Sequence, residues 1–492
     1  MNAQEANQGT IMSEYPNTHT QLLIAGDWCD GSGNRKMPVY NPATGLEIGR
    51  VALAEPADLD RALAAADQGF RVWRATSPLT RAQFMRRAAD LLRERAEAIA
   101  RVITLEQGKP IAQSRIEVAV AADTIDWFAD EGRRAYGQII PPRLPGVIQM
   151  TMKLPIGPVA AFTPWNFPIT QSVRKIAVAL GAGCSMVVKA PEETPASPAA
   201  LVAAFVDAGL PAGVLNVVYG DPTQISDYLI KSPIIRKISF TGSVGVGKHL
   251  ASLAGQQMKR CTMELGGHAP VIVTADADIE KAAQTMVTHK FRNAGQVCVS
   301  PTRFMIEDAA YDQFTDRFVE ISSGLRIGAG IEEDTQLGPL SNSRRLDAID
   351  ELIADAVDQG ATLRCGGRRV GNEGWFFAPT VLAEVPLSAR IMNEEPFGPV
   401  AILNRFTSLD DAIAEANRLP FGLAAYGWTG SDQAAYRMGA EVETGMMSIN
   451  HLGLALPETP FGGVKDSGYG SEGGSEAMEA YLDTRFVTRT FA

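Results

Sequence analysis

The chain of 492 residues lacks any long apolar run, and it has no excess of basic residues. No apolar stretch approaches the roughly 18 residues that indicate a membrane span, so no membrane partner is expected. Lysine and arginine together number 45, against 56 aspartate and glutamate, which gives a net charge of −11. An acidic protein of this kind repels phosphate backbones, so the composition also predicts no nucleic-acid partner.

Neither the cysteines nor the N-terminus indicates metal binding or export. The 5 cysteines stand far apart and form no CxxC pair or Cys/His cluster with the spacing of metal ligands, so no metal site is expected. Reduced thiols of this kind fit a cytoplasmic protein. The first twenty residues, 1–20, have no basic segment followed by an apolar one, which predicts a polar leader rather than a secretory signal.

Helical and extended patterns alternate along most of the chain. The length exceeds that of one ordinary core, so we expect two or three domains. Between 150 and 270, β-rich runs alternate with helical ones, which predicts a parallel, doubly wound sheet. The strand candidates are 159–165, 185–190, 214–220, 237–242 and 268–273. Apolar residues at three- and four-residue spacing predict helices over 55–73, 81–106 and 114–135.

The stretch FTGSVGVGKH, residues 240–249, resembles a P-loop but lacks its hydroxyl. His249 occupies the place of the Ser or Thr that binds magnesium, which makes an ATPase a poor interpretation. A strand that leads through glycines into a helix nevertheless presents backbone N–H groups that bind a diphosphate. An ordinary strand-to-helix turn is an equally good interpretation of this stretch taken alone.

Four short motifs place a polar group among apolar or glycine neighbours. Asn166 in PWNFP precedes an apolar-striped helix, so it is either a helix cap or a donor to a developing oxyanion. Glu264 in MELGG is a carboxylate among apolar residues, a setting that raises a pKa and suits a base, and Glu395 in EEPFGPV is a second candidate. Cys298 in FRNAGQVC is either a small buried residue or a nucleophile.

Seven motifs follow one another along the chain: TPWNFP, VVKAPEETP, FTGS, MELGG, FRNAGQVC, EEPFGPV and PFGGVKDSG. In this order they resemble the aldehyde dehydrogenase superfamily, from about Leu22 to the C-terminus. The resemblance implies an α/β fold of two doubly wound parallel-sheet domains and a small β oligomerisation element. It places NAD binding at 21–137 and 157–266, catalysis at 267–466, and self-association as a homodimer or homotetramer at 138–156 and 467–492.

The same resemblance implies the roles of the site residues. Cys298 is the expected nucleophile, Asn166 and the Cys298 backbone N–H hold the oxyanion, and Glu264 activates the water that hydrolyses the thioester. Glu192 is expected to accept hydrogen bonds from both hydroxyls of a ribose and to repel a 2′-phosphate. NAD is therefore expected as the cofactor, with NADP as the weaker alternative. The residues expected at the cofactor are Thr163, Trp165, Lys189, Glu192, Gly242, Ser243, Leu265, Glu395 and Phe397.

Two arginines indicate the substrate. Arg174 and Arg292 match arginines with which the succinate-semialdehyde branch of the family holds a substrate carboxylate, although either alone is an ordinary surface residue. That branch has a serine shortly before PFGG, whereas this chain has Ala and Leu at 455–456. This loop therefore resembles more closely a related group of the family that oxidises 2-oxoglutarate semialdehyde. The expected substrate is therefore a C4–C5 semialdehyde acid, with Phe167 and Phe461 as apolar walls.

Three alternatives stay open at this point. The first is a broad-specificity dehydrogenase of aliphatic or aromatic aldehydes. The second is an acylating enzyme that depends on coenzyme A, which would not need Glu264 for hydrolysis. The third is a catalytically silent structural member of the fold, against which the intact Cys298, Glu264, Asn166 and Lys189 argue.

Overall fold

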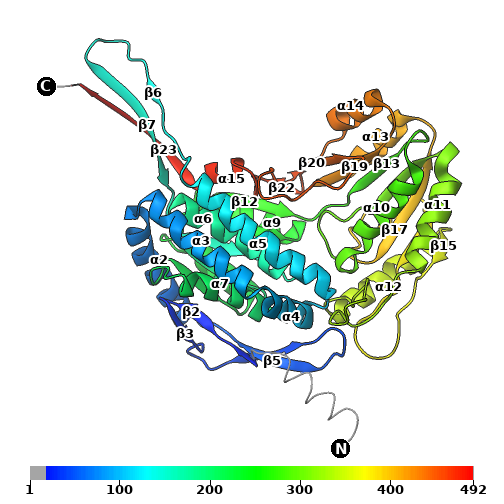
Figure 1. The fold of residues 1–492 in the computed structure, drawn as a ribbon, viewed down its shortest axis with the longest axis horizontal. Coiled ribbons are helices and arrows are strands. Elements are labelled where there is room, and N and C mark those ends of the chain that lie inside the picture. The colour runs from blue at the N-terminus through cyan, green and yellow to red at the C-terminus, as the bar shows by residue number, and fades with distance from the viewer. Residues whose placement is uncertain (1–17, 491–492) are drawn as a thin grey trace, which may run out of the picture.

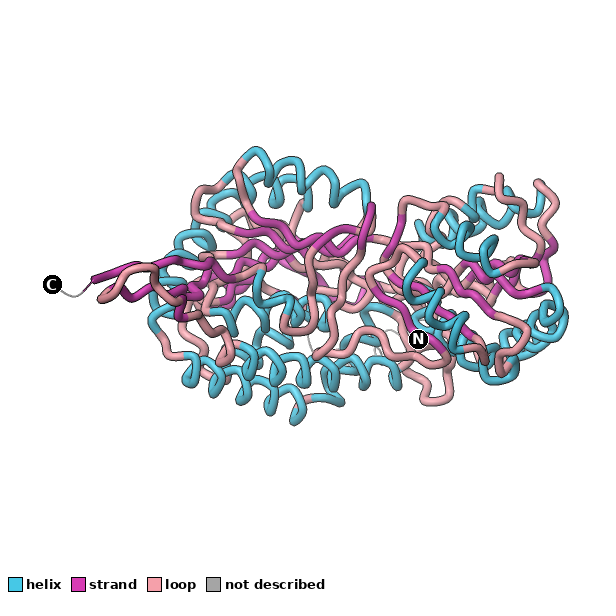
Figure 2. Tube along the Cα trace, turned by 90° about the horizontal axis from the view of Figure 1, so that it is seen from above, coloured by secondary structure: helices cyan, strands magenta, loops and turns pink. Residues whose placement is uncertain are grey.

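The computed structural model describes residues 18–490, which form two lobes and a projecting β ribbon (Figure 1). In the larger lobe the strands lie between two layers of helices (Figure 2). The α/β fold with two parallel sheets that the sequence predicts is confirmed. Most of the predicted leader 1–20 lies outside the described residues, and only its last residues are seen, as the short strand β1, His19–Thr20.

The larger lobe contains an eight-stranded sheet in the order β22-β12-β11-β8-β9-β10-β2-β3. The strands from β12 to β10 are parallel, whereas the edge strands are antiparallel additions. The strands are β2 Leu22–Ile24, β3 Asp27–Cys29, β8 Val159–Phe162, β9 Met186–Lys189, β10 Leu215–Val218, β11 Lys237–Gly242, β12 Arg260–Leu265 and β22 Gly468–Tyr469. The helices are α2 Pro56–Ala75, α3 Pro78–Glu94, α4 Ala96–Gln107, α5 Ile111–Glu131, α6 Pro168–Ala182, α7 Ala196–Asp207, α8 Pro222–Lys231 and α9 Val244–Gln256.

The smaller lobe contains a seven-stranded sheet in the order β15-β16-β17-β14-β13-β19-β20, parallel except for β15. Its strands are β13 Pro270–Val273, β14 Arg303–Glu307, β15 Thr362–Cys365, β16 Thr380–Ala383, β17 Val400–Phe406, β19 Ala424–Trp428 and β20 Met446–Ile449. Its helices are α10 Ile279–Phe291, η1 Arg292–Gly295, α11 Asp308–Ser323, α12 Ser343–Asp358, η2 Arg390–Met392, α13 Leu409–Asn417 and α14 Asp432–Glu441.

The ribbon pairs the extended segment 138–156 with the C-terminal strand, as the sequence predicts. It consists of β6 Ile139–Ile140, β7 Val147–Pro155 and β23 Leu482–Thr490, in the order β23-β7-β6. The remaining elements are β4 Lys36–Tyr40, β5 Glu47–Ala52, β18 Phe421–Gly422, β21 Val464–Lys465 and α15 Glu476–Glu479. The predicted domain boundaries stay predictions. Strand β22 lies in the larger sheet although the sequence places its residues in the oligomerisation element 467–492.

The central strands of the larger sheet are buried on both faces. Every residue of β8, β9 and β10 is buried, which explains their continuous apolar sequences. Helices covering both faces leave the carboxyl ends of the strands as the edge at which ligands bind in such sheets. The turns that follow β8, β11 and β12 leave this edge. PWNFP lies in the first of these turns, whereas FTGS and MELGG begin in the last residues of β11 and β12 and run into the turns.

Two local predictions differ from the structure. The helix predicted over 81–106 is divided into α3 and α4 at Arg95, whose backbone leaves the helical conformation (φ −98°, ψ 8°). A single irregular residue keeps the apolar faces on both sides in phase, so periodicity does not reveal it. The strand β12 was not among the strand candidates, because its sequence RCTMEL begins with charged and polar residues.

Helices α5 and α6 approach each other closely at two glycines. A Cβ atom at Gly132 would lie 2.5 Å from the Gly181 carbonyl oxygen, and one at Gly181 would lie 2.6 Å from the Phe128 carbonyl oxygen. Trp73 of α2 donates its indole N–H to the carbonyl oxygen of Leu180 at 2.9 Å. These contacts fix the C-terminal half of α6 and so help to place the turn that precedes it.

Gly181→Ala should therefore destabilise the protein by about 1–3 kcal/mol, because the added methyl group forces the two helices apart. The shift of the urea unfolding midpoint measures this. Gly439→Ala is the control, since nothing lies within 4 Å of a Cβ atom at that helical position. It should be neutral or stabilise by about 0.5–1 kcal/mol. Equal midpoints for the two variants would contradict a close helix contact at Gly181.

Candidate active site

Cys298 follows a tight turn at the end of α10 and η1. Asn293 has φ 49°, in the left-handed region that few non-glycine residues adopt. Gly295 follows with φ 70°, and a Cβ atom there would lie 2.0 Å from the Gly398 carbonyl oxygen. Gln296 donates its side-chain Nε2 to the Asn293 carbonyl oxygen at 3.1 Å. The loop that carries the thiol is thus fixed by its own turn and by close packing against the rest of the smaller lobe, at Gly398.

Asn166 lies in the turn between β8 and α6, beside the Cys298 loop. The side-chain Nδ2 of Asn166 donates a hydrogen bond to the Gln296 backbone carbonyl oxygen at 3.0 Å. The backbone carbonyl oxygen of Asn166 accepts a hydrogen bond from Nδ2 of Asn293 at 2.9 Å. The N-cap residue of α6 is Phe167, so the interpretation of Asn166 as a mere helix cap is wrong. These bonds join the end of a strand in the larger lobe to the thiol loop of the smaller lobe.

Glu264 lies near the end of β12 and is 1% exposed. Among residues 18–490, its carboxylate oxygens have no hydrogen-bond partner other than the thiol of Cys298. Burial, followed by the negative charge of Glu472, raises the pKa of Glu264 to about 8. Glu472 itself forms a buried ion pair with Lys175, and sequence reasoning missed both residues. A carboxylate with a pKa close to neutrality is suited to accept a proton during a reaction.

The thiol of Cys298 is held in its protonated form by its surroundings. Burial raises its pKa well above the ordinary value, and the charges of Glu264 and Glu395 raise it further, whereas Arg174 lowers it. Because the thiolate is the reactive form, the thiol needs a base to become a nucleophile. Glu264 is a candidate for that base.

A cavity of about 490 Å³ lies where the two lobes meet, and it brings many of the predicted residues together. Side chains from the ends of β8, β11 and β12 surround it together with the thiol of the smaller lobe. The predicted residues that line it are Trp165, Asn166, Gly242, Ser243, Glu264, Leu265, Cys298, Glu395 and Phe397. The predicted residues outside its lining are Thr163, Phe167, Arg174, Lys189, Glu192, Arg292 and Phe461.

One wall of this cavity fits a dinucleotide. Ser243 is the N-cap of α9 and makes no side-chain cap bond, so the first N–H groups of the helix remain free to bind a diphosphate. Glu395 lines the same cavity, and a Cβ atom at Gly266 would lie 2.4 Å from its Oε2, so a side chain at that position would displace the carboxylate. Burial raises the pKa of Glu395 to about 7. A fixed carboxylate of this kind accepts hydrogen bonds from ribose hydroxyls.

Arg345 of α12 is a second feature of this wall that sequence reasoning missed. Its guanidinium lies 5.9 Å from the centre of the Phe397 ring, which Trp165 meets edge-on at 5.8 Å. Its Nη2 donates to the Pro396 carbonyl oxygen, whereas its buried Nε has no partner in the described part of the chain. An unpaired cationic donor in the cavity wall favours an anionic ligand.

Glu192 lines a neighbouring hollow, and Lys189 is its hydrogen-bond partner. Lys189 Nζ donates to Oε2 of Glu192 at 2.6 Å, and the backbone N–H of Gly220 donates to Oε1 at 2.8 Å. Both carboxylate oxygens of Glu192 are therefore held in place. The hollow has a volume of about 530 Å³ and shares Asn342 and Arg344 with the Cys298 cavity. The two spaces adjoin along the edge of the sheet, and Thr163 is buried at the end of β8 beneath that edge.

Arg174 and Arg292 lie beside the thiol. The interpretation of Arg174 as a surface residue is wrong, since it is 3% exposed. Its guanidinium lies 4.2 Å from the centre of the Phe461 ring, and that of Arg292 lies 5.2 Å from the centre of the Phe167 ring. Burial lowers the pKa of both arginines, and the charge of Cys298 opposes that effect. Nη1 of Arg174 and Nε of Arg292 are buried without a hydrogen-bond partner among residues 18–490.

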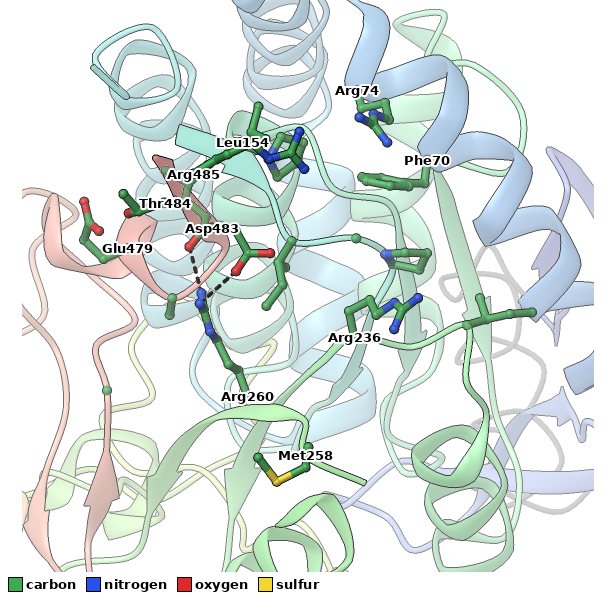
Figure 3. A pocket seen from close by; sticks show the side chains of 18 of the residues that line it. Phe70, Arg74, Leu154, Arg236, Met258, Arg260, Glu479, Asp483, Thr484 and Arg485 are labelled. Atoms are coloured by element: carbon green, nitrogen blue, oxygen red, sulfur yellow. Dashed lines mark hydrogen bonds and ion pairs between the residues drawn. The ribbon is translucent and has the colours of Figure 1, made fainter. Parts of the chain in front are cut away.

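A larger hollow of about 1530 Å³ lies at the base of the ribbon (Figure 3). Figure 3 shows Arg260 paired with Asp483 there, with Phe70 and Arg74 of α2 on another side. None of the predicted site residues lines this hollow. The size of a hollow therefore does not identify the site, whereas the thiol, the carboxylates and the unpaired cations around Cys298 do.

No helix within 18–490 is both apolar enough and long enough to cross a membrane. In the same range, no three or more His, Cys, Asp or Glu side chains stand close enough together to hold a metal ion.

Comparison with known families identifies the chain. The model of the aldehyde dehydrogenase family matches residues 28–487. The chain belongs to the aldehyde dehydrogenase family. Enzymes of this family oxidise aldehydes with NAD or NADP, and the thiol, the carboxylate and the uncapped N-terminus of α9 described above fit that chemistry.

Relatives cover nearly the whole chain. The 4-(hydroxymethyl)benzenesulfonate dehydrogenase TsaD1 of Comamonas testosteroni is 50% identical over 467 residues, which is 95% of this chain and 97% of the relative. The succinate-semialdehyde dehydrogenase [NADP(+)] GabD of Escherichia coli is 41% identical over 467 residues, which is again 95% of this chain and 97% of the relative. The crystal structure of succinate-semialdehyde dehydrogenase from Burkholderia pseudomallei matches with TM-score 0.94 and 39% identity, covering 96% of this chain and 98% of that one.

The raised pKa of Glu264 gives a testable pH dependence. A protonated carboxyl group accepts no proton, so kcat should fall as the pH drops through about 8. Glu472→Gln removes a negative charge that raises this pKa, so the acidic limb of the kcat profile should move to lower pH, by about one pH unit. Glu443→Gln, which removes an exposed carboxylate paired with Lys465, should leave the profile unchanged. An unmoved limb in Glu472→Gln would show that Glu264 does not determine it.

Proposed function

We propose that this protein oxidises an aldehyde that carries an anionic group at its far end, and that NAD is its preferred cofactor. The observation that carries the proposal is the pair of arginines, Arg174 and Arg292, each with a buried donor that lacks a partner within 18–490. An uncompensated buried charge is costly, so the pair favours an anionic ligand beside the thiol. An aldehyde anchored there by its anion would present its carbonyl carbon to Cys298.

In the proposed reaction, the Cys298 sulfur attacks the aldehyde carbon while Glu264 accepts the thiol proton. The backbone N–H of Cys298 and the Asn166 amide donate to the oxyanion, a contribution of roughly 10²–10³ in rate for each such donor. When bound, the nicotinamide supplies the acceptor for the hydride that leaves this carbon. Glu264 releases the thiol proton to solvent and then accepts a proton from the water that attacks the thioester. Collapse of this adduct breaks the C–S bond and releases the carboxylic acid, and Glu264 returns its proton to the sulfur, which restores the thiol.

Glu264 favours hydrolysis over transfer to coenzyme A. Its carboxylate is buried next to the thiol, and its oxygens have no described partner other than that thiol. Such oxygens are available to a water molecule that attacks the thioester. The same intact set of thiol, amide and carboxylate supports an active enzyme over a structural member of the fold.

The first candidate substrate is a C4–C5 semialdehyde acid, namely 2-oxoglutarate semialdehyde or succinate semialdehyde. The relatives named for succinate and glutarate semialdehydes, 41% identical, support it. The second candidate is an aromatic aldehyde with a sulfonate group. The relatives named for a benzenesulfonate, 50% identical, favour it, and the rings of Phe167 and Phe461 against the two guanidiniums would suit an aromatic spacer.

Glu192 supports NAD over NADP. Lys189 and the Gly220 backbone hold its carboxylate in one position. There the carboxylate would accept hydrogen bonds from the ribose hydroxyls and repel a 2′-phosphate. The relative from Escherichia coli is named for NADP, so the preference has to be measured on this chain. Ser243 and Arg345 would hold the diphosphate side, and Glu395 the second ribose.

We also propose that the protein is cytoplasmic and assembles as a homodimer or homotetramer through its ribbon. Large apolar side chains of the ribbon are exposed, among them Ile139, Leu144 and Phe486. An exposed β edge with apolar side chains favours pairing with a second chain. The hollow at the base of the ribbon, with the exposed Met258, continues that surface.

The arginine pair is tested with substrates that differ in charge. Arg174→Gln and Arg292→Gln should each lower kcat/KM about 10- to 100-fold on succinate semialdehyde, because each removes a charge-assisted bond. On a neutral aldehyde of equal length the loss should stay within about threefold. A benzaldehyde sulfonate in the same panel distinguishes the two substrate candidates. Arg317→Gln, which alters an exposed arginine of α11, is the control. Equal losses on charged and neutral aldehydes would refute an anion site.

The cofactor preference is tested by exchanging one glutamate. Glu192→Ser removes the repelling carboxylate, so the ratio of kcat/KM with NADP to kcat/KM with NAD should rise at least about tenfold. Glu193→Ser is the matched control, because that neighbouring glutamate pairs with Arg344 instead. A ratio that changes equally in both variants would remove Glu192 as the determinant.

A further inference from the structure

Two buried charged residues behind Asn166 take no part in the chemistry above. Lys109, between α4 and α5, and Glu117 of α5 have side chains that are 0% and 1% exposed, and Nζ lies 2.6 Å from Oε2. Burying an ion pair costs solvation that a pair of apolar side chains would avoid. What the pair contacts therefore indicates why the core contains it.

Glu117 supplies the cap that α6 lacks. The N-cap residue Phe167 makes no side-chain cap bond. Instead, Oε1 of Glu117 accepts from the backbone N–H of Ile169 at 3.0 Å and of Thr170 at 3.1 Å. These N–H groups belong to the first turn, where a helix offers no internal partner and favours a negative charge. Glu117 thus ties the first turn of α6 to α5.

Lys109 holds the residues just before this turn. Its Nζ donates to the Asn166 carbonyl oxygen at 2.7 Å and lies 3.7 Å from the centre of the Phe167 ring. Burial lowers the pKa of Lys109 to about 8, and the charge of Glu117 opposes this effect. The ammonium group therefore depends on Glu117 to stay charged.

The pair acts at a different place from the other contacts of α6. The glycine contact with α5 and the indole of Trp73 fix α6 near Leu180 and Gly181, close to its C-terminal end. Lys109 and Glu117 instead hold main-chain atoms of residues 166–170, and they leave the Asn166 side chain directed at the thiol loop. Their contacts are concentrated on the segment that carries the candidate oxyanion donor.

We infer that Lys109 and Glu117 form a positioning pair, which holds the Asn166 amide where the oxyanion develops. The inference rests on the role proposed for Asn166. A displacement of about 1 Å in a positioning group costs about 10²-fold in rate, so the pair influences the reaction without touching the substrate.

The test is a double-variant comparison. Glu117→Gln and Lys109→Met are each prepared in the wild-type protein and in Asn166→Ala, and kcat is normalised to titrated Cys298 thiols. In the wild-type background, kcat should fall about 10- to 100-fold, while the aldehyde KM and the NAD dissociation constant stay within about threefold. In the Asn166→Ala background no further loss should occur, because the donor to be positioned is gone.

Arg115→Gln is the matched control. This residue lies on the same helix as Glu117 and pairs with Glu97, but its side chain is 38% exposed, and all the measured constants should be unchanged. A loss in Asn166→Ala as large as in the wild type would overturn the inference, as would a loss that disappears after normalisation to active thiols. Full activity of Asn166→Ala would refute both its proposed role and this inference. The arginine variants test the proposed function separately.

Discussion

Burial at the junction of the two sheets shifts the pKa of the reactive groups around Cys298. Burial is the largest influence on the pKa of the thiol, of Glu264 and of both arginines beside them. In such surroundings a charge is stable only when another charge or a dipole compensates it. The reactivity of the site therefore depends on which charges the protein compensates and which it leaves to a ligand.

The buried charges of the junction fall into two groups. Lys175 with Glu472, and Lys109 with Glu117, are compensated within the chain at short distance. Glu264, Arg174 and Arg292 retain buried polar atoms without a partner among residues 18–490. The first group orders the protein and adjusts the pKa of its neighbours. Under the proposed function, the second group would meet its partners in the reacting molecules, namely a proton and an anion.

The sequence predicts the parallel sheets, the ribbon pairing and the residues that meet at Cys298, because these depend on local patterns and on motif order. The turn that contains Asn166 is an example, since Pro168 and the apolar stripe after it predict that a helix begins there. Long-range partners leave no such pattern. Glu472 lies in a glycine-rich stretch near the C-terminus, and Lys175 lies among apolar residues of α6. Neither segment contains a pattern that indicates their ion pair. Glu117 is one polar position on a long helix, and only the fold shows that it caps α6.

Under the proposed function, the arginines would couple substrate binding to the acidity of the thiol. The positive charge of Arg174 lowers the pKa of Cys298, whereas Glu264 and Glu395 raise it. An anionic substrate that binds Arg174 and Arg292 offsets these positive charges, so binding alone makes the thiolate less favourable. The thiol proton must then pass to Glu264 as the sulfur attacks, not before the substrate arrives. In such a site the sulfur would stay protonated, and so protected from side reactions, until an aldehyde carbon is in place to be attacked and Glu264 accepts the proton.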